Sequence, residues 1–290
     1  MKFSSDHYFH IGHEHVVAGR PCQDHALSFA SSDAAVAVIS DGCSDGKETD
    51  MGARLITFST VSATRTCGKD DTPAGLLSLC IRENTKRIRE EGARALSLAR
   101  ADLLATELYA YMTPLFGYAF MRGDGVIAWK DRVGKVTMAR YDWAHNTPCY
   151  PAYEADNFTS FIEVQGKEDE QGLTEVVYEW TNEDGFKLLS ETTLSIKEAV
   201  HGVQHDWSKE EIHELSLISV MSDGVTRVDD VDWKEVVLQV LALKNTNGEF
   251  LKRRLIRMNK DWSKSGIKPL DDIACSTIYI NHEGEDDDSP

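Results

Sequence analysis

The stretch that decides the fold is Ala34-Ala35-Val36-Ala37-Val38-Ile39-Ser40-Asp41-Gly42-Cys43-Ser44-Asp45-Gly46. Its opening run of small and branched apolar residues is too short for an ordinary helix and predicts a buried strand. The run ends at Asp41, and glycines at positions 42 and 46 supply turn chemistry. A carboxylate at the mouth of a buried strand can bind a hard cation together with nearby carbonyl oxygens. Taken alone, the stretch is explained as simply by a solvated Asp-Gly turn.

Two later stretches repeat this pattern. An apolar run from Leu215 to Met221 ends in Ser222-Asp223-Gly224, and Asp271-Asp272 precedes the apolar strand that begins at Ile273. Three strands with acidic ends can bring Asp41, Asp223 and Asp271 to one end of a sheet sandwich. Clustered carboxylates repel one another unless cations lie between them. The three stretches together therefore predict a metal site.

Charge narrows the range of partners. The chain has 290 residues and carries 31 Lys plus Arg against 48 Asp plus Glu, a formal charge of −17. Such a surface repels nucleic acid and anionic membranes, so neither is expected as a partner. It also repels phosphorylated substrates unless cations reverse the local field. No secretory leader and no bilayer-length apolar run is visible, so a cytoplasmic protein is expected.

The cysteines and histidines give weaker evidence about metal binding. The six cysteines are dispersed without a Cys-x-x-Cys pair, which favours reduced thiols and argues against zinc. Five histidines crowd the N-terminus, and His13 and His15 alternate as on one face of a strand. They could form a transition-metal pair. The simpler interpretation is an exposed strand face.

The remaining pattern predicts one α+β domain over residues 1–282 and a disordered acidic tail over 283–290. The segment 150–159 is expected to be an ordered loop, and 201–214 a polar connection with a short helix start near Trp207. Gly123-Asp124-Gly125 predicts a hairpin turn with Asp124 as a turn residue. Strands are expected at about 7–18, 26–30, 34–40, 103–111, 116–121, 126–129, 136–141, around 164, 176–180, 186–189, 215–221 and 273–280. Helices are expected at 51–66, from Thr72-Pro73 to about 88, at 233–241 and at 250–258.

Five motifs in order identify a family resemblance. Gly19-Arg20-Pro21-Cys22-Gln23-Asp24, Ser40-Asp41-Gly42, Gly123-Asp124-Gly125, Ser222-Asp223-Gly224-Val225 and Asp271-Asp272-Ile273 resemble the metal-dependent protein serine/threonine phosphatases of type 2C. The bacterial branch, with a Gly-x-Pro-Cys-Gln-Asp first motif, is the most similar. The resemblance extends from about His7 to Ile280. It implies a four-layer α-β-β-α sandwich of two antiparallel sheets flanked by helices, with two Mg²⁺ or Mn²⁺ ions at one end.

The resemblance also implies residue roles. Asp41 would bridge both ions, the carbonyl of Gly42 would add a ligand, and Asp223 and Asp271 would complete one shell. Two nearby ions would turn a bridging water into hydroxide and orient it toward phosphorus. Roles are implied for three further residues: Asp24 would hold metal-associated water, Arg20 would clamp the substrate phosphate as a catalytic and binding residue, and Asp124 matches an aspartate that can join Asp223 around a third ion.

Two departures from the family pattern matter. Cys43-Ser44 follows Asp41-Gly42 where many relatives have His-Gly or Ala-Gly. The general-acid histidine proposed for eukaryotic members has no counterpart, so metal-associated water would protonate the leaving group, or it would leave unassisted. His25 is a poor substitute, and Cys43 is interpreted as a small filler rather than a redox thiol. The pair Asp271-Asp272 leaves open which carboxylate binds metal, and the first is preferred.

Three functions remain open. The leading one is Mg²⁺- or Mn²⁺-dependent hydrolysis of phosphoserine and phosphothreonine in proteins, with a partner Ser/Thr kinase as a further expectation. The second is a catalytically weak module that keeps the fold and binds a phosphoprotein or a regulatory partner. The third is the same chemistry on a small phosphoester.

Overall fold

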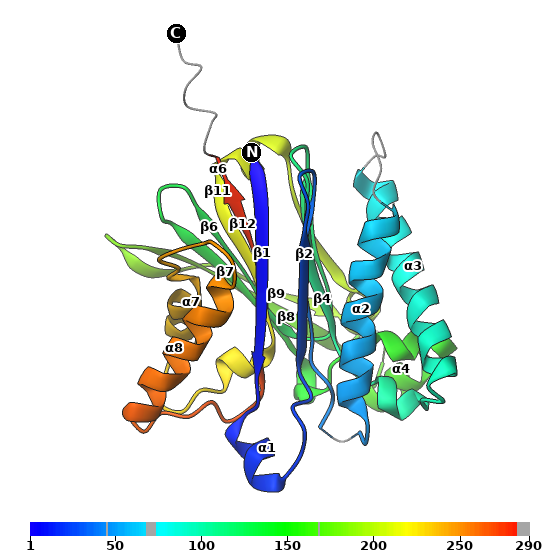
Figure 1. Cartoon of the computed structure of the whole chain (residues 1–290). Helices are drawn as coiled ribbons and strands as arrows, with labels where there is room; N and C mark the ends of the chain where they lie inside the picture. The colour runs from blue at the N-terminus through cyan, green and yellow to red at the C-terminus, as the bar shows by residue number, and fades with distance from the viewer. Residues whose placement is uncertain (45, 68–73, 168, 283–290) are drawn as a thin grey trace.

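The computed structural model describes residues 1–44, 46–67, 74–167 and 169–282. Two antiparallel sheets lie face to face between two helical layers, as Figure 1 shows. The seven-stranded sheet has the order β1-β12-β11-β6-β7-β8-β9, with β1 at Lys2–His10, β12 at Ile273–Asn281, β11 at Leu215–Met221, β6 at Gly125–Asp131, β7 at Val136–Trp143, β8 at Gln171–Thr181 and β9 at Gly185–Ser195. The five-stranded sheet has the order β10-β5-β4-β3-β2, with β10 at Val203–Trp207, β5 at Gly117–Arg122, β4 at Glu107–Met112, β3 at Ala35–Ser40 and β2 at His25–Ala30. The four-layer α+β architecture expected from the sequence is confirmed.

Three large apolar clusters hold the layers together. The central cluster lies between the sheets and includes Ile39 of β3, Leu108 of β4 and Ile218 of β11. On the outer face of the five-stranded sheet pack α2 (Thr49–Cys67) and α3 (Ala74–Ala95). On the outer face of the seven-stranded sheet pack α7 (Trp233–Leu241) and α8 (Phe250–Lys264). Every residue of β3 is buried because both faces of that strand are covered, which explains its unbroken apolar run.

The predicted hairpin at Gly123-Asp124-Gly125 is wrong. The strand before it, β5, pairs with β4 and β10, whereas the strand after it, β6, pairs with β7 and β11. The three residues therefore carry the chain from one sheet to the other. Gly123 and Gly125 have φ values of 115° and 138°, which favour glycine. A crossing and a hairpin both need such residues, so the local sequence does not separate them.

The predicted strand over 7–18 is also wrong in its second half. The strand β1 ends at His10, and α1 follows at His13–Ala18. This short helix has no side-chain N-cap. Its first N–H groups instead bond to the carbonyls of Pro269 and Leu270, 2.9 and 3.0 Å away. These tertiary contacts stabilise a helix that is far too short to form alone.

Several shorter elements also differ from those predicted from the sequence. The segment predicted as an ordered loop contains the 3₁₀ helix η3 (Pro151–Asp156), and Val164 lies in α4 (Thr159–Gln165), not in a strand. The region 201–214 contains β10, followed by α6 at Lys209–Glu214. The remaining short helices are η1 at Arg100–Leu103, η2 at Ala144–Asn146, α5 at Ile196–Ala199 and η4 at Asp223–Thr226. The expected helix start at Thr72-Pro73 and the tail 283–290 lie outside the described residues. Within the described ranges, no helix combines the length and apolar character needed to cross a membrane.

Candidate metal and phosphate site

Asp41 lies at the end of β3, where two backbone contacts with Thr106 hold it. The Asp41 N–H donates to the Thr106 hydroxyl over 2.9 Å, and the Thr106 N–H donates to the Asp41 carbonyl over 2.8 Å. Beyond it, the Gly42 N–H donates to the Gln23 carbonyl. A Cβ at position 42 would lie 2.7 Å from the Thr49 carbonyl and 2.9 Å from that of Gln23. Glycine is therefore required here, and the carboxylate of Asp41 is held at a rigid strand end.

Asp24 is buried beneath this strand end, with 1% of its surface exposed. The Ser222 hydroxyl donates to its Oδ2 over 2.6 Å and itself accepts the Ala274 N–H over 2.9 Å. Ser222 lies immediately before Asp223, and Ala274 lies in β12. This chain of hydrogen bonds joins the first motif of the sequence to the last two.

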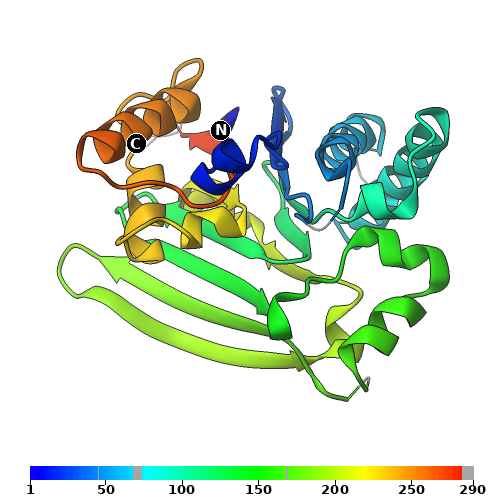
Figure 2. The same ribbon diagram turned by 90° about the horizontal axis from the view of Figure 1, so that it is seen from below.

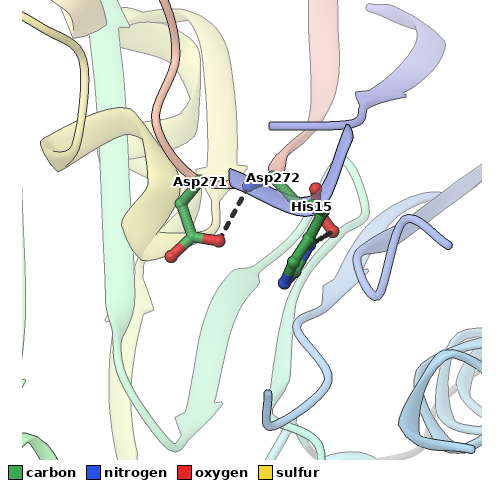
Figure 3. Close-up of side chains that lie close together, drawn as sticks. All are labelled: His15, Asp271 and Asp272. Carbon is green, nitrogen blue, oxygen red and sulfur yellow. Dashed lines mark hydrogen bonds and ion pairs between the residues drawn. The ribbon is translucent and has the colours of Figure 1, made fainter. Parts of the chain in front are cut away.

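Asp271 and Asp272 lie side by side but have different surroundings (Figure 3). Asp272 is 2% exposed, and its carboxylate accepts the Gly12 and Gln23 N–H groups, each over 2.6 Å. Its Oδ2 also lies 2.9 Å from His15 Nδ1. Asp271 is half-buried and receives the Arg227 guanidinium at 2.5 Å. Asp272 thus connects α1 and the Gln23 segment to β12 through hydrogen bonds, while Asp271 pairs with the Arg227 side chain near the surface.

Burial and mutual proximity raise the pKa values of the clustered carboxylates. Burial raises the pKa of Asp41 well above its usual value, and the charges of Asp24, Asp223 and Asp124 add to the effect. Burial is also the main cause of the raised pKa of Asp24, with further contributions from Asp272 and Asp223. Acids from five separate motifs therefore lie within electrostatic range at one end of the sandwich. Figure 2 views the molecule from the end where α1 lies.

Asp223 and Asp124 belong to the same group. The pKa of Asp223 is raised by burial and then by the charge of Asp271. That of Asp124, which is 7% exposed, is raised well above its usual value by burial, followed by Asp223. Asp142 of β7 contributes to both shifts. The sequence around Asp142 is that of an ordinary strand, so it did not indicate that Asp142 lies near the other acids.

His15, Asp271 and Asp272 have ligand atoms within 4.8 Å of one another, a spacing that could suit a metal ion. The contacts already described account for this group. His15 is buried, and its Nε2 lies 3.4 Å from the Ser44 hydroxyl while Nδ1 contacts Asp272. A histidine and two backbone N–H groups thus occupy the Asp272 carboxylate, and the cluster serves to hold α1. The predicted exposed strand face with His13 and His15 is wrong, because both residues lie in α1 and His15 is buried. His13 Nε2 lies 3.4 Å from Lys268 Nζ.

Arg20, Cys43 and His25 surround the acids differently. The exposed Arg20 donates from Nη1 to the Ser44 carbonyl over 3.0 Å, which places it beside the Asp41–Ser44 turn. Cys43 is half-buried, and its N–H bonds to the Leu104 carbonyl. His25 is 6% exposed and contacts the Thr57 hydroxyl at 2.6 Å. Burial and then Arg54 lower the pKa of His25 to about 4, so it is neutral near pH 7 and packs in the core.

The sequence did not indicate the supporting roles of three residues: His15 as a partner of Asp272, Ser222 as a hydrogen-bond bridge, and Arg227 as a partner of Asp271. Arg227 lies four residues after Asp223, and it pairs with Glu14 as well as with Asp271. The spacing from Asp223 was a usable signal for Arg227. The partners of His15 and Ser222 lie far away in the sequence, so no local pattern could reveal them.

The donor set fits hard divalent cations. It consists of carboxylate and carbonyl oxygens, which Mg²⁺ and Mn²⁺ prefer over nitrogen and sulfur. Burial first, and then the charges of the neighbouring acids, destabilise the charged carboxylates and raise their pKa values, and bound cations would offset both effects.

Comparison with known proteins shows the family of the chain. A family model described as protein phosphatase 2C matches residues 11–261. The chain belongs to the protein phosphatase 2C family. None of the curated proteins matches it significantly.

Solved structures share the fold across nearly the whole chain. The serine/threonine phosphatase Stp1 from Staphylococcus aureus is 12% identical with a TM-score of 0.54, covering 97% of this chain and 96% of that one. The serine/threonine phosphatase of S. agalactiae is 12% identical with a TM-score of 0.56, over 96% and 100% of the two chains. PppA, a regulatory component of T6SS in Pseudomonas aeruginosa, is 12% identical with a TM-score of 0.51, over 96% and 98%. At such low identity these likenesses show a common fold.

Proposed function

We propose that the protein hydrolyses phosphoserine and phosphothreonine in other proteins with the help of two divalent cations, Mg²⁺ or Mn²⁺. The observation that carries this proposal is the convergence of Asp24, Asp41, Asp124, Asp223 and Asp271. Burial raises the pKa of the first four, and the charges of neighbouring acids add to the rise. Family membership supports the same activity.

The contacts suggest a division of roles among the acids. Asp41 and the Gly42 carbonyl would lie between the cations, because the turn around them is rigid and close to the other acids. Asp223 and Asp271 would complete the ligand shell of one cation. Asp271 is preferred over Asp272, because two N–H groups and His15 already occupy the Asp272 carboxylate. Asp124 next to Asp223 would serve a third ion.

Bound divalent cations would supply charge neutralisation at the phosphoryl oxygens and make water acidic enough to act as the nucleophile. Asp24, fixed by Ser222, would accept a hydrogen bond from that water and orient it. Arg20 is exposed beside the Asp41–Ser44 turn, and its planar guanidinium can bind two phosphoryl oxygens. Cys43 stands where a histidine would supply a proton, so the leaving oxygen would take its proton from water.

The test is hydrolysis of an aryl phosphate and of a phosphoserine peptide with Mn²⁺ or Mg²⁺ present. Asp41→Asn and Asp223→Asn should each lower kcat/KM at least about a hundredfold, because each removes charge from the cation shell. Asp33→Asn is the matched control, since Asp33 is exposed in the turn before β3, at the opposite end of that strand from Asp41. Full activity in either site variant would reject the assigned site.

A binding module is the competing function. Isothermal titration calorimetry with Mn²⁺ separates it from the enzyme. Binding in the wild type that is lost in Asp41→Asn supports the catalytic proposal. A folded wild type that neither binds Mn²⁺ nor cleaves phosphate would instead support a phosphoprotein-binding role.

A further inference from the structure

Two cysteines far apart in the sequence meet outside the acidic site. Cys67 is the last residue of α2, and Cys80 lies in the second turn of α3. Their Sγ atoms are 2.7 Å apart, although both are free thiols. A disulfide has an S–S distance of about 2.05 Å. The sulfurs thus need to approach by well under 1 Å to bond.

Asn84, one turn further along α3, holds this pair in place. Its Nδ2 donates to Cys67 Sγ over 3.1 Å and also lies 3.5 Å from Cys80 Sγ. A third contact, of 3.0 Å to the Cys80 carbonyl, anchors the amide to its own helix. Both cysteines are half-buried, so a small oxidant can reach them. By contrast, Cys149 and Cys275 are buried.

The pair is remote from the acids. The helix α2 has 19 residues, and Thr49 at its start contacts Gln23 and the Cys43 carbonyl. At about 1.5 Å per residue, Cys67 lies roughly 27 Å away along the helix axis. Figure 1 shows the two ends of α2 at opposite ends of the molecule, with α1 near the Thr49 end.

We propose that Cys67 and Cys80 form a reversible disulfide when the protein meets hydrogen peroxide. The thiolate of Cys67 attacks one peroxide oxygen, giving a sulfenic acid and hydroxide, which takes up a proton as water. The Cys80 thiol then attacks that sulfur, the S–S bond forms, and a second water leaves. The two cysteines lose two electrons and two protons, and the peroxide is reduced to two waters.

The cross-link joins the two helices of one outer layer. A bond between residues 67 and 80 closes a short loop and restricts the unfolded chain, so the oxidised protein should be more stable than the reduced one. Burial, and then the neighbouring Cys80, raise the pKa of the Cys67 thiol to about 11. The reduced pair is therefore mostly protonated near neutral pH. Because the thiolate is the reactive form, oxidation by peroxide should be slow at pH 7 and become faster as the pH rises.

Peptide mapping of the full-length protein tests this proposal. Reduced protein is treated with hydrogen peroxide, its remaining thiols are alkylated after denaturation, and it is digested with trypsin. Lys69 and Arg82 provide cleavage sites that separate the two cysteines into different peptides. The expected product is a pair of peptides linked through Cys67 and Cys80, with four of the six cysteines alkylated and all six recovered after dithiothreitol. The melting temperature should rise by about 5–10 °C on oxidation.

Matched variants complete the test. Cys67→Ser and Cys80→Ser should each abolish both the linked peptides and the rise in melting temperature, whereas Cys22→Ser, at another half-buried cysteine, should keep both. Circular dichroism confirms that each variant is folded. Six alkylated cysteines after oxidation, or a sulfinic acid at Cys67 without a cross-link, would overturn the proposal. These readouts do not depend on phosphatase activity.

Discussion

The adjacent residues Asp271 and Asp272 have different roles in this protein. Asp271 faces Arg227 and the other acids, whereas Asp272 points its carboxylate at backbone N–H groups of Gly12 and Gln23. A buried carboxylate that accepts several N–H donors is a structural tie. The sequence Asp-Asp contains no information that distinguishes the two. Only the positions of the donors, more than two hundred residues away, do so.

This difference predicts opposite effects of two matched substitutions. Asp272→Ala should lower the free energy of unfolding by about 3–5 kcal/mol, because it leaves buried N–H groups without an acceptor. Asp271→Ala, at the half-buried position, should cost about 1 kcal/mol or less but should weaken Mn²⁺ binding. Urea denaturation and calorimetry measure the two quantities. If Asp271→Ala bound Mn²⁺ as tightly as the wild type, Asp271 would not be a ligand.

At the scale of elements, one carboxylate of η3 forms ion pairs with both α3 and β5. Glu154 pairs with Arg89 over 2.9 Å and with Arg122 over 2.5 Å, and both arginine side chains are less than 10% exposed. Burial alone would raise the pKa of Glu154, but the two guanidinium groups hold it below its usual value. The carboxylate is therefore charged throughout the neutral range.

Glu154→Gln should lower the free energy of unfolding by about 2–4 kcal/mol at pH 7, because two buried guanidinium groups lose their counter-charge. The folded pKa lies below the usual 4.5, so the contribution of Glu154 is fully present above pH 4.5 and is lost as the pH falls through the folded value. The difference between wild type and variant should accordingly shrink under acidic conditions. Denaturant titrations at pH 7 and near pH 4 measure it.

Glu163→Gln, on the exposed face of α4, is the control and should leave stability within about 0.5 kcal/mol. A Glu154→Gln variant whose deficit is the same at both pH values would show that the effect is steric.

The errors in element prediction have two physical causes. The strands β3, β11 and β12 could be predicted from their apolar runs, which occur because both faces of each strand are covered. The helix α1 and the segment η3 have no such local signal, since distant carbonyls and arginines hold them. The crossing at Gly123–Gly125 resembles a hairpin because both need positive φ. Asp41, Asp223 and Asp271 could be singled out from the sequence because each adjoins a strand, whereas Asp142 and the contacts of His15 and Ser222 could not.

At the scale of the whole molecule, the charge of −17 shapes which substrates can approach. Fields from exposed charges steer charged ligands and are screened over about 10 Å at 0.1 M salt. A phosphoserine peptide flanked by Lys and Arg should therefore have a kcat/KM several times higher than one flanked by Asp and Glu at low ionic strength.

Added salt should shrink that difference, because it screens the field. Steady-state assays of the two peptides at about 20 mM and 300 mM NaCl measure this effect. Aryl phosphate hydrolysis serves as the reference, because it lacks flanking charges. A preference that is equally large at both salt concentrations would point to specific side-chain contacts instead of the overall field.

The pairing of β1 with β12 joins the two ends of the fold along nine residue pairs, from Lys2 with Asn281 to His10 with Ile273. Asp24 and Asp41 are synthesised early, but β12 and the neighbouring Asp271 emerge from the ribosome more than 200 residues later. Until β12 is synthesised, β1 lacks the only strand it pairs with among the described residues, and the other acids lack Asp271. The cation site that we propose would therefore stay incomplete until Asp271 and β12 have been synthesised, and Mn²⁺ should bind with full affinity only after β12 has paired with β1.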